Sequence, residues 1–151
     1  LVGDCMKFDL WNQPNQFSLI VPETWGADEL DGLTEFVPER GDAAINVTFL
    51  RKMSNIASMD RDVQLIVEQF AAKNGLLPRG ELALQSFSAW WRCFGEYGSG
   101  NDKKMPNYWF LCSVAGQSGA AMASLCCDDV QSRSYIEGVE MLKGLKYLKK
   151  D

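Results

Sequence analysis

Two segments of the chain carry large apolar side chains at successive positions, and this feature constrains the fold more than any other. In segment 82–94 these side chains would point to both faces of a strand, Leu82, Leu84, Trp90 and Phe94 to one and Phe87, Trp91 and Cys93 to the other. Segment 107–115 repeats the pattern. A sheet built from such strands must be covered on both faces. Either helices cover both faces, or a second chain covers one of them.

The rest of the chain alternates between an apolar period of two and one of 3.6 residues, which distinguishes strands from helices. Period-two segments predict strands at 17–21, 33–37 and 44–49, with 33–37 at a sheet edge, then a long strand at 81–94 and two strands joined by a glycine-bounded turn at 116–119. Period-3.6 segments predict helices near 59–74 and 132–148. Segment 95–106 is polar and predicts a loop.

These elements predict an α+β fold of one domain, with the order β-β-β-α-β-β-β-α. We expect a sandwich with a central antiparallel sheet of five or six strands and two principal helices, because the short connections of the second half require antiparallel pairing. A chain of 151 residues is long enough to bury a substantial core. We expect residues 1–15 to be irregular and residues 16–151 to form the domain.

Composition excludes several classes of function. The chain has no histidine, which removes the commonest neutral-pH base and the commonest zinc ligand. Its net charge of −5 argues against nucleic acid as a ligand. No apolar run approaches the ~20 residues that a membrane-spanning helix needs, so we expect no stable membrane insertion. The five cysteines form no CxxC pair, which favours a cytoplasmic location, or a periplasmic one if a leader was removed.

No catalytic signature is present, and we expect a protein that is not an enzyme and uses no cofactor. The one local cluster with metal-ligand residue types is Cys126-Cys127-Asp128-Asp129. Adjacent strand residues point to opposite faces, so the two thiols cannot readily share one ion. We therefore expect no metal site.

Three features could bind a partner. Carboxylates crowd residues 28–42; their simplest interpretation is a solvated surface, and their functional one is docking of a basic protein. The connection 95–106 joins the two most aromatic strands. The adjacent residues Trp90 and Trp91 would point to opposite faces of their strand, so only one of them can belong to a given surface. The candidate partner-binding residues are therefore Asp28, Glu29, Asp31, Glu35, Trp91, Tyr97 and Asp102.

The segment FSLIVPETW places Phe17, Leu19, Pro22 and Trp25 in the spacing F-x-L-x-x-P-x-x-W. With the element order, this spacing resembles the PsbP-like superfamily over nearly the whole chain. Its relatives include a Ran-binding nuclear import protein, bacterial envelope lipoproteins and effector-associated chaperones of type VI secretion. The resemblance implies a non-enzymatic module that works through protein contacts. The arginine-rich strand end of the secretion chaperones is missing, so none of their ligand contacts carries over.

Two hypotheses follow for the function. The first is a bacterial immunity protein, antitoxin-like, that neutralises a basic toxin by direct binding through the acidic region. The second is a secretion chaperone or adaptor that holds a hydrophobic segment of a secreted effector on an apolar sheet face, with a homodimer as one possible form. An acidic docking site would lose association rate steeply as salt rises, whereas capture by an apolar face would not.

Overall fold

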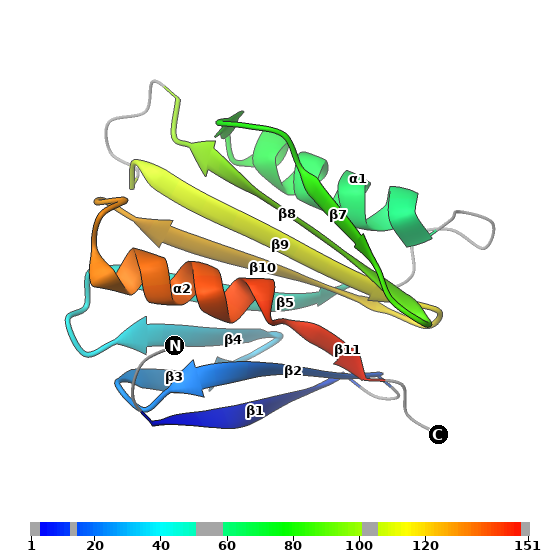
Figure 1. The fold of residues 1–151 in the computed structure, drawn as a ribbon, viewed down its shortest axis with the longest axis horizontal. Helices are drawn as coiled ribbons and strands as arrows, with labels where there is room; N and C mark the ends of the chain where they lie inside the picture. The colour runs from blue at the N-terminus through cyan, green and yellow to red at the C-terminus, as the bar shows by residue number, and fades with distance from the viewer. Residues whose placement is uncertain (1–3, 13–14, 51–58, 101–105, 149–151) are drawn as a thin grey trace.

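A computed structural model describes residues 4–12, 15–50, 59–100 and 106–148 (Figure 1). Its strands and helices are, in chain order, β1 Cys5–Asn12, β2 Asn15–Pro22, β3 Trp25–Leu30, β4 Leu33–Pro38, β5 Ala43–Leu50, α1 Met59–Lys73, β6 Leu77–Pro78, β7 Ala83–Ser86, β8 Trp90–Gly98, β9 Tyr108–Gly116, β10 Ala120–Cys127, α2 Arg133–Lys143 and β11 Lys146–Leu148. The fold is α+β with antiparallel strands and two helices, as the sequence predicts.

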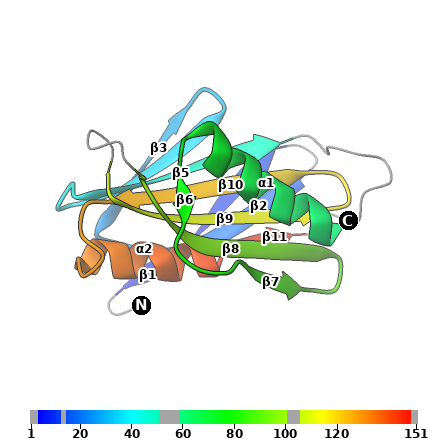
Figure 2. The same cartoon turned by 90° about the horizontal axis from the view of Figure 1, so that it is seen from above.

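The strands form two sheets. The larger has eight strands in the order β3-β4-β5-β10-β9-β8-β6, with β7 also paired to β8, and the smaller has the order β1-β2-β11. Helix α1 packs on one face of the large sheet, and α2 packs on the other beside the small sheet (Figures 1 and 2). The prediction of five or six strands was therefore too low: eleven strands are present in the described part of the chain.

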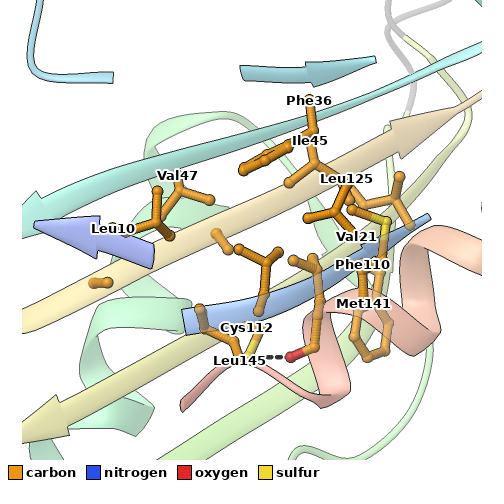
Figure 3. Packing of buried hydrophobic residues seen from close by; sticks show 14 of the residues in the cluster. Leu10, Val21, Phe36, Ile45, Val47, Phe110, Cys112, Leu125, Met141 and Leu145 are labelled. Atoms are coloured by element: carbon orange, nitrogen blue, oxygen red, sulfur yellow. Dashed lines mark hydrogen bonds between the residues drawn. The ribbon is translucent and has the colours of Figure 1, made fainter. Parts of the chain in front are cut away.

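Strand β9 lies at the centre of these layers and is buried on both faces. Cys112 and Val114 pack in the cluster with α2 and β2, whereas Leu111 and Ala115 pack in the cluster with α1. Figure 3 shows the first of these clusters. No second chain is needed to cover either face: α1 packs on one, and α2 with the small sheet packs on the other.

Three predicted elements differ from the structure. Strand β1 occupies residues that we expected to be irregular, because a strand in which Leu10 alone is fully buried has little apolar periodicity. The single strand predicted at 81–94 is two strands, β7 and β8, that pair as a hairpin, and the Phe87 N–H donates to the Trp90 carbonyl at 2.9 Å to close the turn. Helix α2 ends at Lys143, and Gly144 leads into β11.

A predicted loop and a predicted edge strand also differ from the structure. Residues Gly95–Gly98 belong to β8 and not to the loop predicted at 95–106. Strand β4, expected at an edge, lies between β3 and β5, so β3 is the edge strand. The sequence of β3, WGADEL, shows no apolar alternation because five of its six residues are exposed.

A buried polar network holds the small sheet to the turn between β9 and β10. The Tyr147 hydroxyl donates to Asn15 Oδ1 at 2.9 Å, and Asn15 Nδ2 donates to the Ser118 carbonyl at 3.3 Å. A side chain at Gly116 would overlap the Tyr147 ring, so glycine is required there for the close approach. The network therefore joins residues from β2, β11 and the 116–119 turn.

We expect Tyr147→Phe to lower the free energy of unfolding by about 1 kcal/mol, because it removes a hydrogen bond to a buried amide oxygen. Urea denaturation followed by circular dichroism measures the change. Tyr108→Phe is the matched control, since the Tyr108 hydroxyl has no hydrogen-bond partner among the described residues. An equal loss in both variants would contradict a specific role for the network.

The start of α2 is held by the connection between β4 and β5. Ser132 is the N-cap residue and accepts a hydrogen bond from the Ser134 N–H at 3.1 Å. The Ser132 hydroxyl also donates to Asp42 Oδ2 at 2.8 Å. Hydrogen bonds from Ser134 and Ser132 lower the pKa of Asp42 below its ordinary value of 3.8, against the opposing effect of burial. A negative charge here also suits the positive end of the helix.

We expect Asp42→Asn to destabilise the protein at pH 7 by at most about 1 kcal/mol, because the carboxylate is largely exposed and screened by solvent. Since the folded-state pKa is lowered, this stabilisation is fully present above pH 3.8 and is lost as the pH falls below that value. Urea denaturation between pH 7 and pH 2.5 should therefore show the two proteins converging in acid. A constant difference at every pH would contradict this origin.

Candidate protein-binding surface

Four carboxylates lie on the hairpin formed by β3 and β4, and we call this group the acidic hairpin surface: Asp28, Glu29, Asp31 and Glu35. The hairpin turns at Asp31-Gly32, and Gly32 has a φ of +72°, a conformation that favours glycine. Asp28, Glu29 and Asp31 are exposed, and Glu35 is half-buried. All four residues lie on one hairpin, where Asp28 and Glu35 share a face, whereas Glu29, next to Asp28 in the strand, points to the opposite face.

The charges of this surface oppose one another. Asp28 lies directly opposite Glu35 in the β3–β4 pair, and like charges at such positions destabilise a sheet. No lysine or arginine of the described chain forms an ion pair with any of the four carboxylates; the ion pair between described residues is Lys7–Asp9. The hairpin therefore carries four negative charges that form no ion pair with a lysine or arginine of the described residues.

A hollow of about 290 Å³ lies at the base of the same hairpin. Its lining comes from the start of β1, the β2–β3 and β4–β5 connections and the first turn of α2. Four carboxylates and two guanidinium groups line it: Asp4, Glu23, Glu39 and Glu137 with Arg40 and Arg133. The hollow extends the negative region towards α2 but offers both signs of charge to a partner.

Two of the other three candidate residues, Trp91 and Tyr97, lie in β8, away from this surface. Trp91 is half-buried and packs in the cluster with α1, whereas Trp90 packs on the opposite face. Tyr97, which we expected at a loop tip, is in β8 with 4% of its side chain exposed. Burial raises the pKa of its phenol, with smaller contributions from Cys93 and Glu68. Asp102 lies outside the described residues.

The thiols are poorly placed for chemistry. Burial raises the pKa of Cys93 to about 11 and that of Cys112 to about 12, so both are protonated at neutral pH and are weak nucleophiles. Cys127 packs into the cluster with α2, while its neighbour Cys126 lies on the opposite face of β10. Within the described ranges, no three metal-ligating side chains gather closely enough to hold an ion.

The sequence did not predict a second hollow. It lies beside α1, where the helix meets β5 and β10, and has a volume of about 480 Å³. Its residues come from three separate segments, so no local motif marks it. The helical stripe of α1 did indicate that Ile66 and Phe70 face the sheet, but it could not indicate that space remains beside them.

In the described part of the chain, neither helix has the length and apolar character that crossing a membrane requires.

The four motif residues are part of the scaffold rather than of a site. Phe17 and Leu19 of β2 are buried in the cluster with α2, Pro22 ends that strand, and Trp25 begins β3 with 5% exposure. The indole nitrogen of Trp25 is buried without a hydrogen-bond acceptor among the described residues, so this side chain contributes through packing. The motif therefore carries information about the fold.

The chain matches no protein-family model and no curated protein sequence. It is similar in structure to cyanobacterial PsbP (CyanoP) from Synechocystis sp. PCC 6803, with a TM-score of 0.63 and 9% sequence identity, over 97% of this chain and 95% of that one. It is also similar to a protein from Bacteroides thetaiotaomicron VPI-5482, with a TM-score of 0.51 and 16% identity, over 89% of this chain and 46% of that one.

The chain spans about half of the Bacteroides protein and nearly all of the solved cyanobacterial one. At such identities, likeness extends to the fold and not to the activity. The order of elements, the packed motif residues and the extent of the match to the cyanobacterial structure agree with the resemblance seen in the sequence. This chain has a PsbP-like fold.

Proposed function

We propose that this chain is a non-enzymatic protein-binding module that binds a basic protein through the acidic hairpin surface, with an immunity protein that neutralises a toxin as the leading form. The observation that carries the proposal is the Asp28–Glu35 pair on an exposed edge hairpin. The fold tolerates a repulsive pair there, and a cationic partner would relieve the repulsion.

The position of the hairpin suits recognition. Strand β3 is the last strand of the large sheet, so its outer edge has no neighbouring strand among the described residues. Charged side chains on such an edge discourage indiscriminate strand pairing. They leave it open to a segment of complementary charge, and that charge would also accelerate encounter with the partner.

The absence of catalysis in this proposal rests on the chemistry of the reactive groups. The sequence has no histidine, and the buried thiols of Cys93 and Cys112 have raised pKa values. The carboxylates of the acidic hairpin surface lie on an open strand edge, whereas acid–base pairs in hydrolases need a site that separates their pKa values. Protein binding requires only exposed charge from this surface, whereas acid–base catalysis would also require carboxylates with separated pKa values.

The adaptor hypothesis has less support. It requires an apolar sheet face that is free to hold a hydrophobic segment, but the aromatic strands β8 and β9 pack against α1 on one face and α2 on the other. Exposed large apolar side chains are scattered among separate elements, for example Trp11 in β1, Leu30 in β3 and Leu77 in β6. We therefore place the acidic interaction first.

The repulsion can be tested without a partner. We expect the double variant Asp28→Asn/Glu35→Gln to raise the free energy of unfolding by about 0.2–1 kcal/mol at low salt, because it removes a cross-strand like-charge pair. The gain should shrink in 0.5 M NaCl, where exposed charges are screened. Asp128→Asn/Glu140→Gln makes the same change in net charge at exposed positions elsewhere and should give a smaller gain. Equal gains would mean that total charge, and not this pair, is responsible.

Binding can be tested with the product of the neighbouring gene. We expect Asp28→Asn/Glu35→Gln to slow its association by tenfold or more at low salt, while Asp128→Asn/Glu140→Gln changes it little. Biolayer interferometry at 50–500 mM NaCl measures both rate constants, and the wild-type association rate should fall steeply with salt. A rate that is independent of salt and unchanged in the hairpin variant would reject the acidic docking site and favour apolar capture.

A further inference from the structure

Helix α1 covers β8 and β9, and a hollow of about 480 Å³ remains where its second half meets β5 and β10. Strand β5, which lines the hollow, is the neighbour of β4 in the large sheet, and Thr48 in the lining pairs with Leu33, so the hollow lies near the acidic hairpin surface but shares no residue with it. Its volume falls within the range of small-molecule sites in proteins, about 300–1,000 Å³. The residues that line it divide into an apolar set and a polar set.

The apolar set comes from both the helix and the sheet. Ile66 of α1 and Met122 of β10 are its deeply buried members, with 4% and 3% exposure. Leu50 of β5 and Phe70 of α1 are half-buried. The Phe70 ring lies 6.5 Å from the Trp109 ring. These side chains offer apolar contact to a ligand from both the helix and the sheet.

The polar set consists of Thr48 of β5 and three residues at the end of α1. Among the described residues that line the hollow, Lys73 is the one with a charge, and Gln69 and Asn74 are its polar neighbours on that side. Asn74 Nδ2 donates to the Phe70 carbonyl at 2.8 Å, which fixes the end of the helix beside the lysine. Lys73 is exposed and forms no ion pair with a described residue, so its ammonium group is available to a ligand.

We propose that this hollow binds a small amphiphilic anion, with its apolar body against Leu50, Phe70 and Met122 and its anionic group at Lys73. Apolar side chains and a single positive charge complement such a molecule, and the described lining residues include no carboxylate that would repel it. A cationic ligand would meet the ammonium group of Lys73. A neutral apolar ligand would make the apolar contacts but would form no ion pair with Lys73. This site contains none of the four residues of the acidic hairpin surface and does not rest on the proposed function.

A pair of fluorescent probes separates the two contributions. 1-Anilinonaphthalene-8-sulfonate carries the same aromatic body as N-phenyl-1-naphthylamine and adds one negative charge. We expect both probes to bind the folded protein saturably with one site. Lys73→Gln should weaken binding of the anionic probe about tenfold, the equivalent of one charge-assisted hydrogen bond, and leave the neutral probe unchanged. Dodecanoate should displace the anionic probe at lower concentration than dodecanol does.

Matched variants locate the site. Gln69→Trp places a large side chain in the hollow and should weaken both probes, whereas Gln64→Trp, at an exposed position of α1 outside this lining, should weaken neither. Lys143→Gln removes a lysine from the last turn of α2 and should not affect the anionic probe. Circular dichroism and thermal unfolding establish that each variant is folded.

The proposal is overturned by absent saturable binding, by equal losses in the Gln64→Trp and Gln69→Trp variants, or by a Lys73→Gln effect that appears equally in Lys143→Gln. Equal weakening of the charged and neutral probes by Lys73→Gln would also overturn it, because the lysine would then act through the fold. Loss of protein binding in the acidic hairpin variant with unchanged probe binding separates this site from the proposed function.

Discussion

Burial of β9 on both faces is the constraint on which the rest of the architecture depends. Cys112 and Val114 need an apolar cover on one side, and Leu111 and Ala115 need one on the other. Each large apolar side chain removed from water contributes about 1.5–3 kcal/mol, so neither face could remain exposed in a stable protein. Helix α1 meets one requirement. The other face is too wide for α2 alone, and the small sheet of β1, β2 and β11 completes the cover.

The elements that cover the second face also bury the guanidinium group of Arg92, which has hydrogen-bond acceptors in the interior. Arg92 of β8 is 8% exposed, donates from Nη1 to the Leu145 carbonyl at 2.8 Å and from Nε to Gln85 at 2.8 Å, and lies over the rings of Phe87 and Trp90. A buried cation without these contacts would be costly. Its contacts instead hold the segment after α2 against the edge of the large sheet, where β11 can pair with β2.

The sequence predicts the elements whose burial is one-sided and regular. Strands β2, β4 and β5 and helix α1 lie where the apolar period placed them, and α2 begins there but ends earlier. The apolar period does not predict the elements whose positions depend on tertiary contacts. Strand β1 and β3 are edge strands with few buried side chains, β11 is three residues long, and the break between β7 and β8 falls inside a continuous apolar run. Tyr97 was misplaced for the same reason: glycines on either side of it suggested a loop, but the strand continues through them.

The same reasoning explains which parts of the candidate sites could be anticipated. The acidic residues are close together in the chain and lie on one hairpin, so their proximity could be predicted from the sequence. The hollow beside α1 joins Leu50, Phe70 and Met122 from three segments, and its existence depends on how far the helix extends over the sheet. This fold uses both faces of its central strands for packing, so both proposed sites lie at its margins. The margins here are an exposed edge hairpin and the end of a helix, and a fold shared at 9% identity does not determine the chemistry of either.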